Sequence, residues 1–171
     1  MATKILFLDI DGVLNCMNVP DKKPFHDERC YGLNPALVAN LKRVVDSTGC
    51  KIVVSSSWRY FKDYKPFRKN CEWKKVLADM LGYDADSLFI GDTPTVFGTR
   101  GKQIVQWLSE NCKKLHSPVK ICVVDDEISD IVDEISKNVV VKTDYMHGLT
   151  ESDADKIIDI FDNSDDCLTI Q

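Results

Sequence analysis

Five short hydrophobic runs recur along the chain and alternate with longer segments in which hydrophobic residues follow a helical period. Each run is mostly β-branched or aliphatic and lacks polar alternation. This pattern is typical of strands that are covered on both faces of a parallel sheet. The predicted strands are Lys4–Leu8, Lys51–Val54, Leu88–Ile90, Lys120–Val124 and Val139–Val141.

The segments between and after these runs predict amphipathic helices with recognisable ends. In the first helix, Asn34 suits the N-cap, Pro35 suits the first turn and Gly49 ends the periodic pattern. A later helix ends at Gly82, and the last one begins after Thr150 with a variant of the capping box. Because repeated β–α units favour right-handed crossovers, we expect one α/β domain in which a parallel sheet lies between two helical layers.

Composition agrees with an ordinary globular protein and narrows the choice of compartment. The 171 residues are 44% hydrophobic and 29% charged, with a net charge of -5 that disfavours non-specific binding to nucleic acid. No apolar run approaches the roughly 18 residues of a membrane span, and the first residues do not resemble a signal peptide. The seven cysteines lack zinc-site spacing, which favours reduced thiols. We therefore expect a cytoplasmic protein with no membrane association, and the sequence implies no obligate protein partner.

Polar residues gather directly after three of the predicted strands, where parallel sheets bind their ligands. Asp9 and Asp11 follow the first strand, and Gly12 allows the chain to turn there; Ser55 follows the second strand and Asp125-Asp126 the fourth. Carboxylates placed this close together repel one another, so one of them takes a proton or the group binds a cation. Hard oxygen ligands suit Mg²⁺ together with a substrate phosphate, and one acid can attack while another handles a proton.

These residues also carry a resemblance to a known family. The stretch Ile5–Asn15, with Asp9-Ile10-Asp11-Gly12-Val13-Leu14, resembles the first signature of the haloacid dehalogenase-like (HAD) phosphohydrolases. Ser55 resembles the second signature, Arg100 or Lys102 the basic third, and Val123-Val124-Asp125-Asp126 the acidic fourth. The resemblance implies a Rossmann-like HAD core whose strands lie in the order fifth, fourth, first, second, third.

The resemblance also implies a role for each signature. Asp9 would be the nucleophile that forms an aspartyl-phosphate, and Asp11 would protonate the leaving oxygen and then activate water. Mg²⁺ would be held by Asp9, the backbone carbonyl of Asp11 and a carboxylate of the pair Asp125-Asp126. A serine after the second strand would bind the phosphoryl oxygens, and a basic residue, Arg100 or Lys102, would neutralise their charge.

Several assignments stay open at this point. Ser56 and Ser57 compete with Ser55, which is favoured as the first residue past the strand, and Asp125 is not separable from Asp126 as the metal ligand. The segment Phe89-Ile90-Gly91-Asp92 also fits a fourth signature, with Lys74 or Lys75 as its basic partner. We favour the paired acids at 125 and 126, and we expect Asp92 to cap a turn.

Short gaps between the signatures leave no room for a cap domain. Residues 16–33 predict only a flap-like insertion, and residues 58–82 a basic and aromatic helical segment. Within it, residues 58–75 hold seven basic residues against two acidic ones, a balance of +5, with aromatic residues interleaved. This combination is typical of contacts with single-stranded nucleic acid.

A closer resemblance supports that substrate class. Ser55-Ser56-Ser57-Trp58-Arg59, Arg100-Gly101-Lys102-Gln103-Ile104, Asp125-Asp126-Glu127 and Gly148-Leu149-Thr150 are similar to segments of the capless phosphatase domains in bacterial RNA-repair proteins, which are related to polynucleotide kinase-phosphatases. The resemblance implies a phosphatase for the phosphorylated ends of RNA or DNA, in which Ser56, Ser57 and Arg59 contact substrate. The alternatives are a phosphatase for nucleotides or sugar phosphates and a non-catalytic phosphate-binding module.

Overall fold

A five-stranded sheet lies at the centre of the molecule. The computed structural model describes residues 2–18, 26–27, 30–60, 72–95, 98–115 and 117–163. The strands lie in the order β5-β4-β1-β6-β7, and each pairs in parallel with its neighbours. They are β1 (Thr3–Leu8), β4 (Lys51–Val54), β5 (Phe89–Asp92), β6 (Val119–Asp125) and β7 (Val140–Lys142). The predicted α/β class and strand order are both confirmed.

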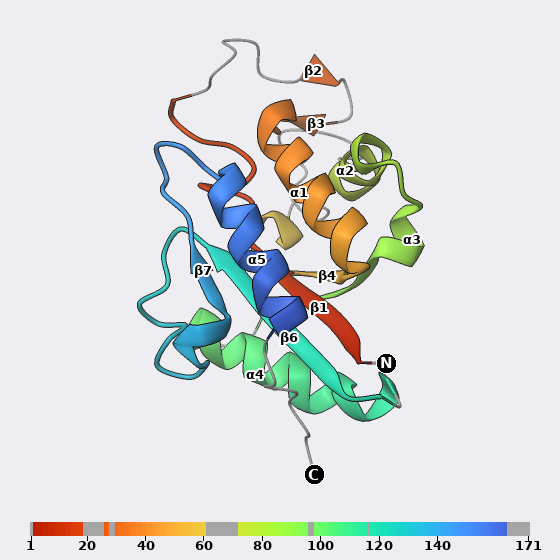
Figure 1. Cartoon of the computed structure of the whole chain (residues 1–171), viewed down its shortest axis with the longest axis vertical. Coiled ribbons are helices and arrows are strands. Elements are labelled where there is room, and N and C mark those ends of the chain that lie inside the picture. The colour runs from red at the N-terminus through yellow and green to blue at the C-terminus, as the bar shows by residue number, and fades with distance from the viewer. Residues whose placement is uncertain are drawn as a thin grey trace.

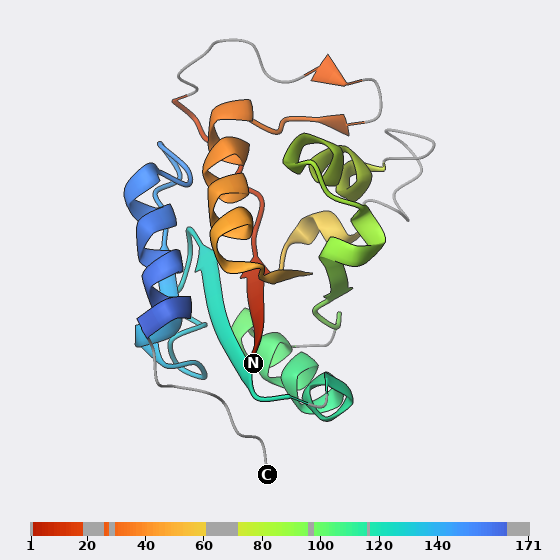
Figure 2. The ribbon, with the colours of Figure 1, turned by 45° about the vertical axis from the view of Figure 1, so that its right-hand side comes forward.

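Helices cover the two faces of the sheet (Figures 1 and 2). The long ones are α1 (Pro35–Thr48), α2 (Trp73–Leu81), α4 (Arg100–Asn111) and α5 (Glu151–Asn163). Leu6 and Leu8 of β1 pack with α1, α2 and α5, whereas Ile5 and Phe7 pack with α4 on the opposite face. Alternate residues of one strand therefore enter two different hydrophobic layers, as expected for a central strand that is buried on both faces.

Shorter elements connect this framework. They are α3 (Ala85–Leu88), the 3-10 helices η1 (Ser57–Tyr60), η2 (Cys112–Leu115) and η3 (Lys137–Val139), and the antiparallel pair β2 (His26–Asp27) and β3 (Cys30–Tyr31). Within the described residues, no helix combines the length and the apolar character that a bilayer crossing requires.

The predicted helix ends are confirmed, and β4 has the predicted bounds. The other four strands differ by one or two residues: β1 and β6 begin one residue earlier than predicted, β5 and β7 begin one residue later, and β5, β6 and β7 end later. Asn34 caps α1 through its side chain, and Gly49 and Gly82 end α1 and α2 with φ values of 66° and 79°. Leu88 ends α3 instead of starting a strand, because the Asp84 side chain caps that short helix. Val139 likewise belongs to η3 and not to the strand that follows it.

Two predicted segments lie partly outside the described residues. The flap-like insertion at 16–33 includes 19–25 and 28–29, and the basic segment at 58–82 includes 61–71, none of which the structure describes. The described remainder of the basic segment forms η1 and α2. The extent of a single domain over 1–171 stays a prediction.

Candidate active site

The ends of three adjacent strands bring Asp9, Ser55 and Asp125 side by side. In the register of the sheet, Leu8 is level with the residues that precede Ser55 and Asp125. The ladders also continue past the end of β1: Asp9 N donates to Val124 O at 3.1 Å, and Ser55 N donates to Leu8 O at 2.8 Å. The backbone therefore fixes the positions of these three residues before any side-chain contact is considered.

Three carboxylates converge at this edge. One oxygen each from Asp9, Asp125 and Asp126 lies within 4.8 Å of the others. Asp9 and Asp125 are buried, with exposed fractions of 4% and 2%, and Asp126 is half-buried. Burial raises the pKa of Asp9, although Arg100 opposes the rise. Burial, with the nearby Asp9 charge, raises the pKa of Asp125 to about 7. The cluster resists carrying all of its negative charge unless a cation offsets it.

Arg100, at the first turn of α4, supplies such a cation from the protein itself. Its Nη1 atom lies 2.8 Å from Asp9 Oδ1 and 2.7 Å from Asp125 Oδ2, and donates to Ser55 O at 2.6 Å. Its backbone N donates to Asp130 Oδ2 at 2.8 Å, which fixes the start of the helix beside the cluster. Lys102, the alternative basic residue, is exposed on the same helix. Of the two candidates, the fold brings Arg100 to the carboxylates.

The turn after β1 depends on Gly12. This residue has φ 73°, and a Cβ atom there would lie 2.5 Å from the Cγ atom of Asp126. Gly12 O accepts a hydrogen bond from Thr143 Oγ1 at 2.8 Å, and Thr143 N donates to Asp125 O at 3.0 Å. Thr143 therefore ties the turn to β6. The sequence pattern did not single out this role of Thr143.

Asp11 lies beside the carboxylate cluster but is not part of it. Its Oδ1 atom accepts from Asn15 Nδ2 at 2.7 Å, and both of its carboxylate oxygens lie 3.0 Å from Trp58 Nε1. The Asn15 side chain also accepts from Gly12 N at 3.0 Å. The structure thus separates a half-buried acid, held by an amide and an indole, from the buried carboxylates around Asp9. Neither Asn15 nor Trp58 was predicted as a site residue on its own.

The three candidate serines occupy different environments. Ser56 is buried, and a hydrogen bond from its side chain lowers the pKa of Asp9 against the larger effect of burial. Ser55 is also buried, but its Oγ atom has no partner among the described residues. Ser57 is exposed at the start of η1. Of the three serines, Ser56 is therefore the one whose hydroxyl group lies beside Asp9.

Arg59 is placed inside the fold. It is 8% exposed, and its guanidinium donates to Thr93 Oγ1 at 3.0 Å and to Gln103 Oε1 at 2.8 Å. These hydrogen bonds connect η1, the residue after β5 and the second turn of α4. Such cross-links hold η1 in place beside the carboxylate cluster.

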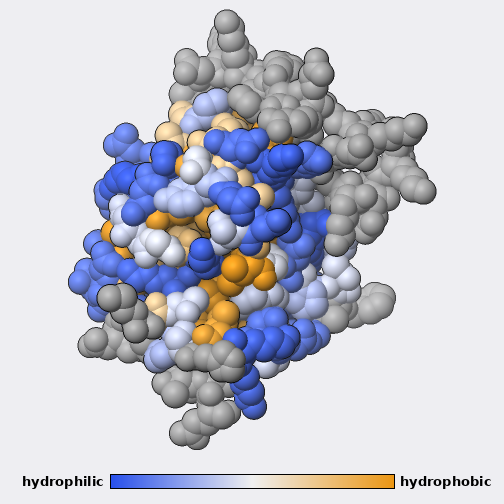
Figure 3. All heavy atoms as spheres, turned by 90° about the vertical axis from the view of Figure 1, so that its right-hand side faces the viewer, coloured by the Kyte–Doolittle hydropathy of each residue, from blue (hydrophilic) through white to orange (hydrophobic). Residues whose placement is uncertain are grey.

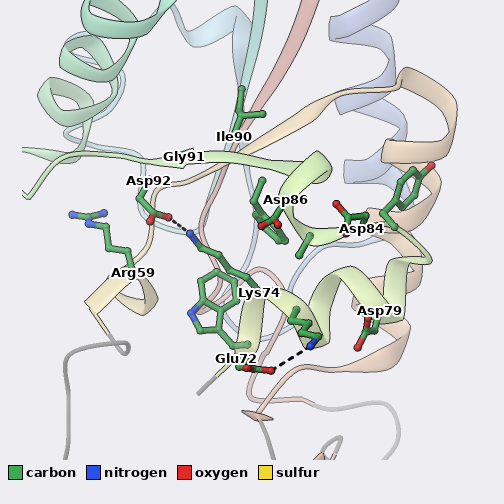
Figure 4. A pocket seen from close by; sticks show the side chains of 14 residues that line it. Arg59, Glu72, Lys74, Asp79, Asp84, Asp86, Ile90, Gly91 and Asp92 are labelled. Carbon is green, nitrogen blue, oxygen red and sulfur yellow. Dashed lines mark hydrogen bonds and ion pairs between the residues drawn. The ribbon is translucent and has the colours of Figure 1, made fainter. Parts of the chain in front are cut away.

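The alternative fourth signature lies at the edge of the sheet, where β4 separates it from Asp9. Asp92 is the last residue of β5, and its carboxylate pairs with Lys74 Nζ at 2.5 Å. Lys74 of α2 reaches this carboxylate (Figure 4), and the expectation that Asp92 caps a turn stays a prediction.

The Lys74–Asp92 pair lines a cavity of about 830 Å³ between α2, α3 and β5. Its lining includes the acidic side chains of Glu72, Asp79, Asp84, Asp86 and Asp92, which are labelled in Figure 4. The face that carries α3 is mostly hydrophilic, with a smaller hydrophobic area in its middle (Figure 3). Among the lining residues, these acids outnumber Arg59, Lys74 and Lys75. The cavity is therefore a poor match for a phosphate.

The class of protein follows from the fold and this edge of the sheet. A parallel sheet in this order, an Asp-x-Asp turn after its central strand, an acidic pair after the neighbouring strand and a helix-borne arginine together define a HAD-type domain. A family model described as the HAD domain in Swiss Army Knife RNA repair proteins matches residues 5–154, so the chain belongs to this family. Comparison with curated proteins and with solved structures gave no match. Membership of this family points to a phosphatase.

Proposed function

We propose that the protein is a Mg²⁺-dependent phosphomonoester hydrolase that works through an aspartyl-phosphate. The observation that carries the proposal is the pairing of two acids with different surroundings on one turn. Asp9 is buried against Arg100 and Asp125, whereas Asp11 is half-buried and held by neutral donors. Two carboxylates in different environments suit a nucleophile and a proton carrier, respectively.

The carboxylate cluster has the chemistry of a magnesium site. Carboxylate oxygens are hard ligands, and those of Asp9, Asp125 and Asp126 lie close enough together to share one ion. The pKa values of Asp9 and Asp125 are raised because burial removes water from their negative charges. When bound, Mg²⁺ would offset this charge and polarise the phosphoryl oxygens of the substrate.

The residues of the chain perform the bond changes in two steps. A carboxylate oxygen of Asp9 attacks phosphorus, the bond from phosphorus to the leaving oxygen breaks, and the Asp11 carboxyl gives its proton to that oxygen. In the second step, water attacks the phosphorus of the aspartyl-phosphate, and the Asp11 carboxylate takes a proton from that water. Inorganic phosphate leaves and the Asp9 carboxylate is restored, so no co-substrate other than water is consumed.

Two further groups would hold the phosphoryl group. The Ser56 side chain contacts Asp9, and Arg100 carries a positive charge at the same carboxylate. A hydroxyl donor and a guanidinium next to the nucleophile stabilise the negative charge that spreads over the phosphoryl oxygens in the transition state. We therefore assign the serine role to Ser56 instead of Ser55, and the basic role to Arg100 instead of Lys102.

The substrate that we propose is a phosphorylated end of RNA or DNA. The family to which the chain belongs is described from RNA repair proteins, and residues 58–75 carry a balance of +5 with interleaved aromatic residues. Basic and aromatic side chains contact single strands through phosphates and bases.

The test compares hydrolysis of p-nitrophenyl phosphate by the unaltered chain, Asp9→Asn and Asp92→Asn, each with Mg²⁺ and with a chelator. We expect activity only with Mg²⁺, loss of at least 1,000-fold in Asp9→Asn because the nucleophile is gone, and little change in Asp92→Asn. Asp92 is the matched control, since it also ends a strand of the same sheet. Full activity of Asp9→Asn would refute the proposal.

The substrate class is tested by comparing kcat/KM for mononucleotides and for phosphorylated oligonucleotides. A preference for mononucleotides would favour a small-molecule phosphatase.

A further inference from the structure

We propose that Trp58 is a positioning residue: its indole N–H holds the Asp11 carboxylate in the orientation for proton transfer to the leaving group. This inference rests on the proposed function, because it assigns a partner to the acid of that reaction. The indole nitrogen lies 3.0 Å from each of the two carboxylate oxygens of Asp11. A donor equidistant from both oxygens fixes the distance and direction of the carboxylate, and the hydrogen bond from Asn15 Nδ2 to Oδ1 at 2.7 Å resists its rotation.

Trp58 reaches Asp11 from a different part of the chain than its other partner. Asn15 belongs to the same turn as Asp11 and moves with it, whereas Trp58 belongs to η1, 47 residues further along. Among the described residues, the indole is the donor that ties Asp11 to the rest of the molecule. Without it, the described donor that remains on the Asp11 carboxylate is Asn15 of the same turn.

The indole is itself firmly held, so it is able to act as a fixed reference. Trp58 is 5% exposed, and its ring meets that of Trp73 edge-on, with centroids 5.6 Å apart at 88°. Trp73 Nε1 also donates to Trp58 O at 3.2 Å. Both the ring and the backbone of Trp58 are thus anchored on the first residue of α2.

Trp58 also connects the two proposed catalytic acids through Ser56, which lies two residues before it. Trp58 N donates to Ser56 Oγ at 3.3 Å, and the same serine side chain hydrogen-bonds to Asp9. The proposed nucleophile is therefore contacted by Ser56, the residue before η1, and the proposed acid by Trp58 within η1. The arrangement sets the position of the acid relative to the phosphoryl group that the nucleophile attacks.

The proposal predicts a change in leaving-group dependence. A nitrophenolate leaves without much help from an acid, whereas the more basic phenolate needs a proton in the transition state. In Trp58→Phe, which keeps an aromatic ring but lacks the N–H, we expect kcat/KM for phenyl phosphate to fall about tenfold. We expect the value for p-nitrophenyl phosphate to fall less than about twofold, since kcat/KM reports the step in which the leaving group departs.

The matched control is Trp107→Phe. Trp107 is also 5% exposed and also meets an aromatic ring edge-on, that of Phe7 at 5.5 Å and 84°, but it lies in the other hydrophobic layer. The Trp107→Phe variant should lower the melting temperature about as much as Trp58→Phe does. It should leave the ratio of kcat/KM for phenyl phosphate to kcat/KM for p-nitrophenyl phosphate unchanged. If Trp58→Phe does not fold, benzothienylalanine at position 58 replaces only the N–H by sulfur and gives the same test.

Asp11→Asn and the double variant separate the two proposals. If Asp11→Asn leaves the ratio of the two substrates unchanged, the proposed function of Asp11 is wrong. Suppose instead that Asp11→Asn changes the ratio, whereas Trp58→Phe lowers kcat/KM equally for both substrates or for neither of them. In that case only the positioning role is overturned. The positioning role also requires that Trp58→Phe have no further effect on the ratio in the Asp11→Asn background, because the group on which it acts is then absent.

Discussion

At the scale of single residues, the site depends on which basic side chain reaches the buried carboxylates. Arg100 Nη1 contacts Asp9 and Asp125 within 2.8 Å, whereas Lys102 is exposed. Arg100→Ala is expected to lower kcat for p-nitrophenyl phosphate by about 100-fold or more, since it removes a preorganised charge from the transition state. Lys102→Ala should stay within about twofold of the unaltered chain, because its side chain lies outside the cluster. A larger loss in Lys102→Ala than in Arg100→Ala would reverse the assignment.

A second residue-scale prediction concerns Gly12. Gly12→Ala adds a methyl group that would overlap Asp126, at 2.5 Å from its Cγ atom. We expect the Mg²⁺ concentration for half-maximal activity to rise at least about tenfold, because a displaced carboxylate binds the ion less well. Gly49→Ala is the control: its φ of 66° is similar, yet nothing lies within 4 Å of the new Cβ.

Both glycine variants should lose about 1 kcal/mol of unfolding free energy from the left-handed backbone. Only Gly12→Ala should change the metal requirement. Equal metal requirements in the two variants would show that Asp126 is not a ligand, and would leave Asp9 and Asp125 as the metal-binding pair.

At the scale of elements, the start of α5 supports the turn after β1. Asp153 accepts hydrogen bonds from Thr150 N and Oγ1 at 3.2 and 2.6 Å, and Asp153 N donates to Thr150 Oγ1 at 3.2 Å. The preceding residue, Leu149, donates its N–H to Val13 O at 2.8 Å. The capping box thus holds α5 at the end of the loop that packs on the turn after β1.

This cap predicts a pH-dependent contribution to stability. Burial raises the pKa of Asp153, but hydrogen bonds from Lys156 and Thr150 outweigh it and hold the pKa below its usual value. A lowered pKa contributes stability that is present above the unfolded-state value of 3.8 and is lost as the pH falls. Asp153→Ala should therefore cost about 1 kcal/mol in urea unfolding at pH 7 and less at pH 3. Asp159→Ala, an exposed position of the same helix, should cost little at either pH; a pH-independent loss at position 153 would contradict the ionic cap.

The elements were more predictable from sequence than the contacts between them. Local signals such as Asn34, Gly49 and Gly82 mark helix ends because they act on their own backbone. Strand order followed from the family resemblance, and the signatures placed Asp9 and Asp125 correctly at one edge. Contacts over long sequence separations carry no such local signal. The approach of Trp58 to Asp11, of Thr143 to Gly12 and of Lys74 to Asp92 depends on how whole elements pack.

At the scale of the whole molecule, the net charge of -5 opposes an anionic substrate, whereas the +5 balance of residues 58–75 attracts it. Residues 61–71 lie outside the described part of the chain, so the experiment addresses their charges directly. For a 3′-phosphorylated oligonucleotide, we expect kcat/KM to fall steeply with NaCl concentration, because each neutralised phosphate of a single strand releases counterions. The value for p-nitrophenyl phosphate should change little by comparison.

Replacement of two lysines of this segment provides the decisive comparison. Lys62→Gln/Lys65→Gln should raise KM for the oligonucleotide. The slope of log(kcat/KM) against log[NaCl] should become less negative by about 1.4, because two charges are removed. Lys113→Gln/Lys114→Gln removes the same charge from η2, which follows the end of α4 opposite to Arg100 and therefore lies away from the carboxylate cluster. Identical slopes in the two double variants would show that the basic segment attracts the substrate only through the overall charge of the protein. A phosphatase whose oligonucleotide and p-nitrophenyl phosphate activities respond alike to salt does not bind the strand beyond its terminal phosphate, and its substrates would then be small phosphate esters.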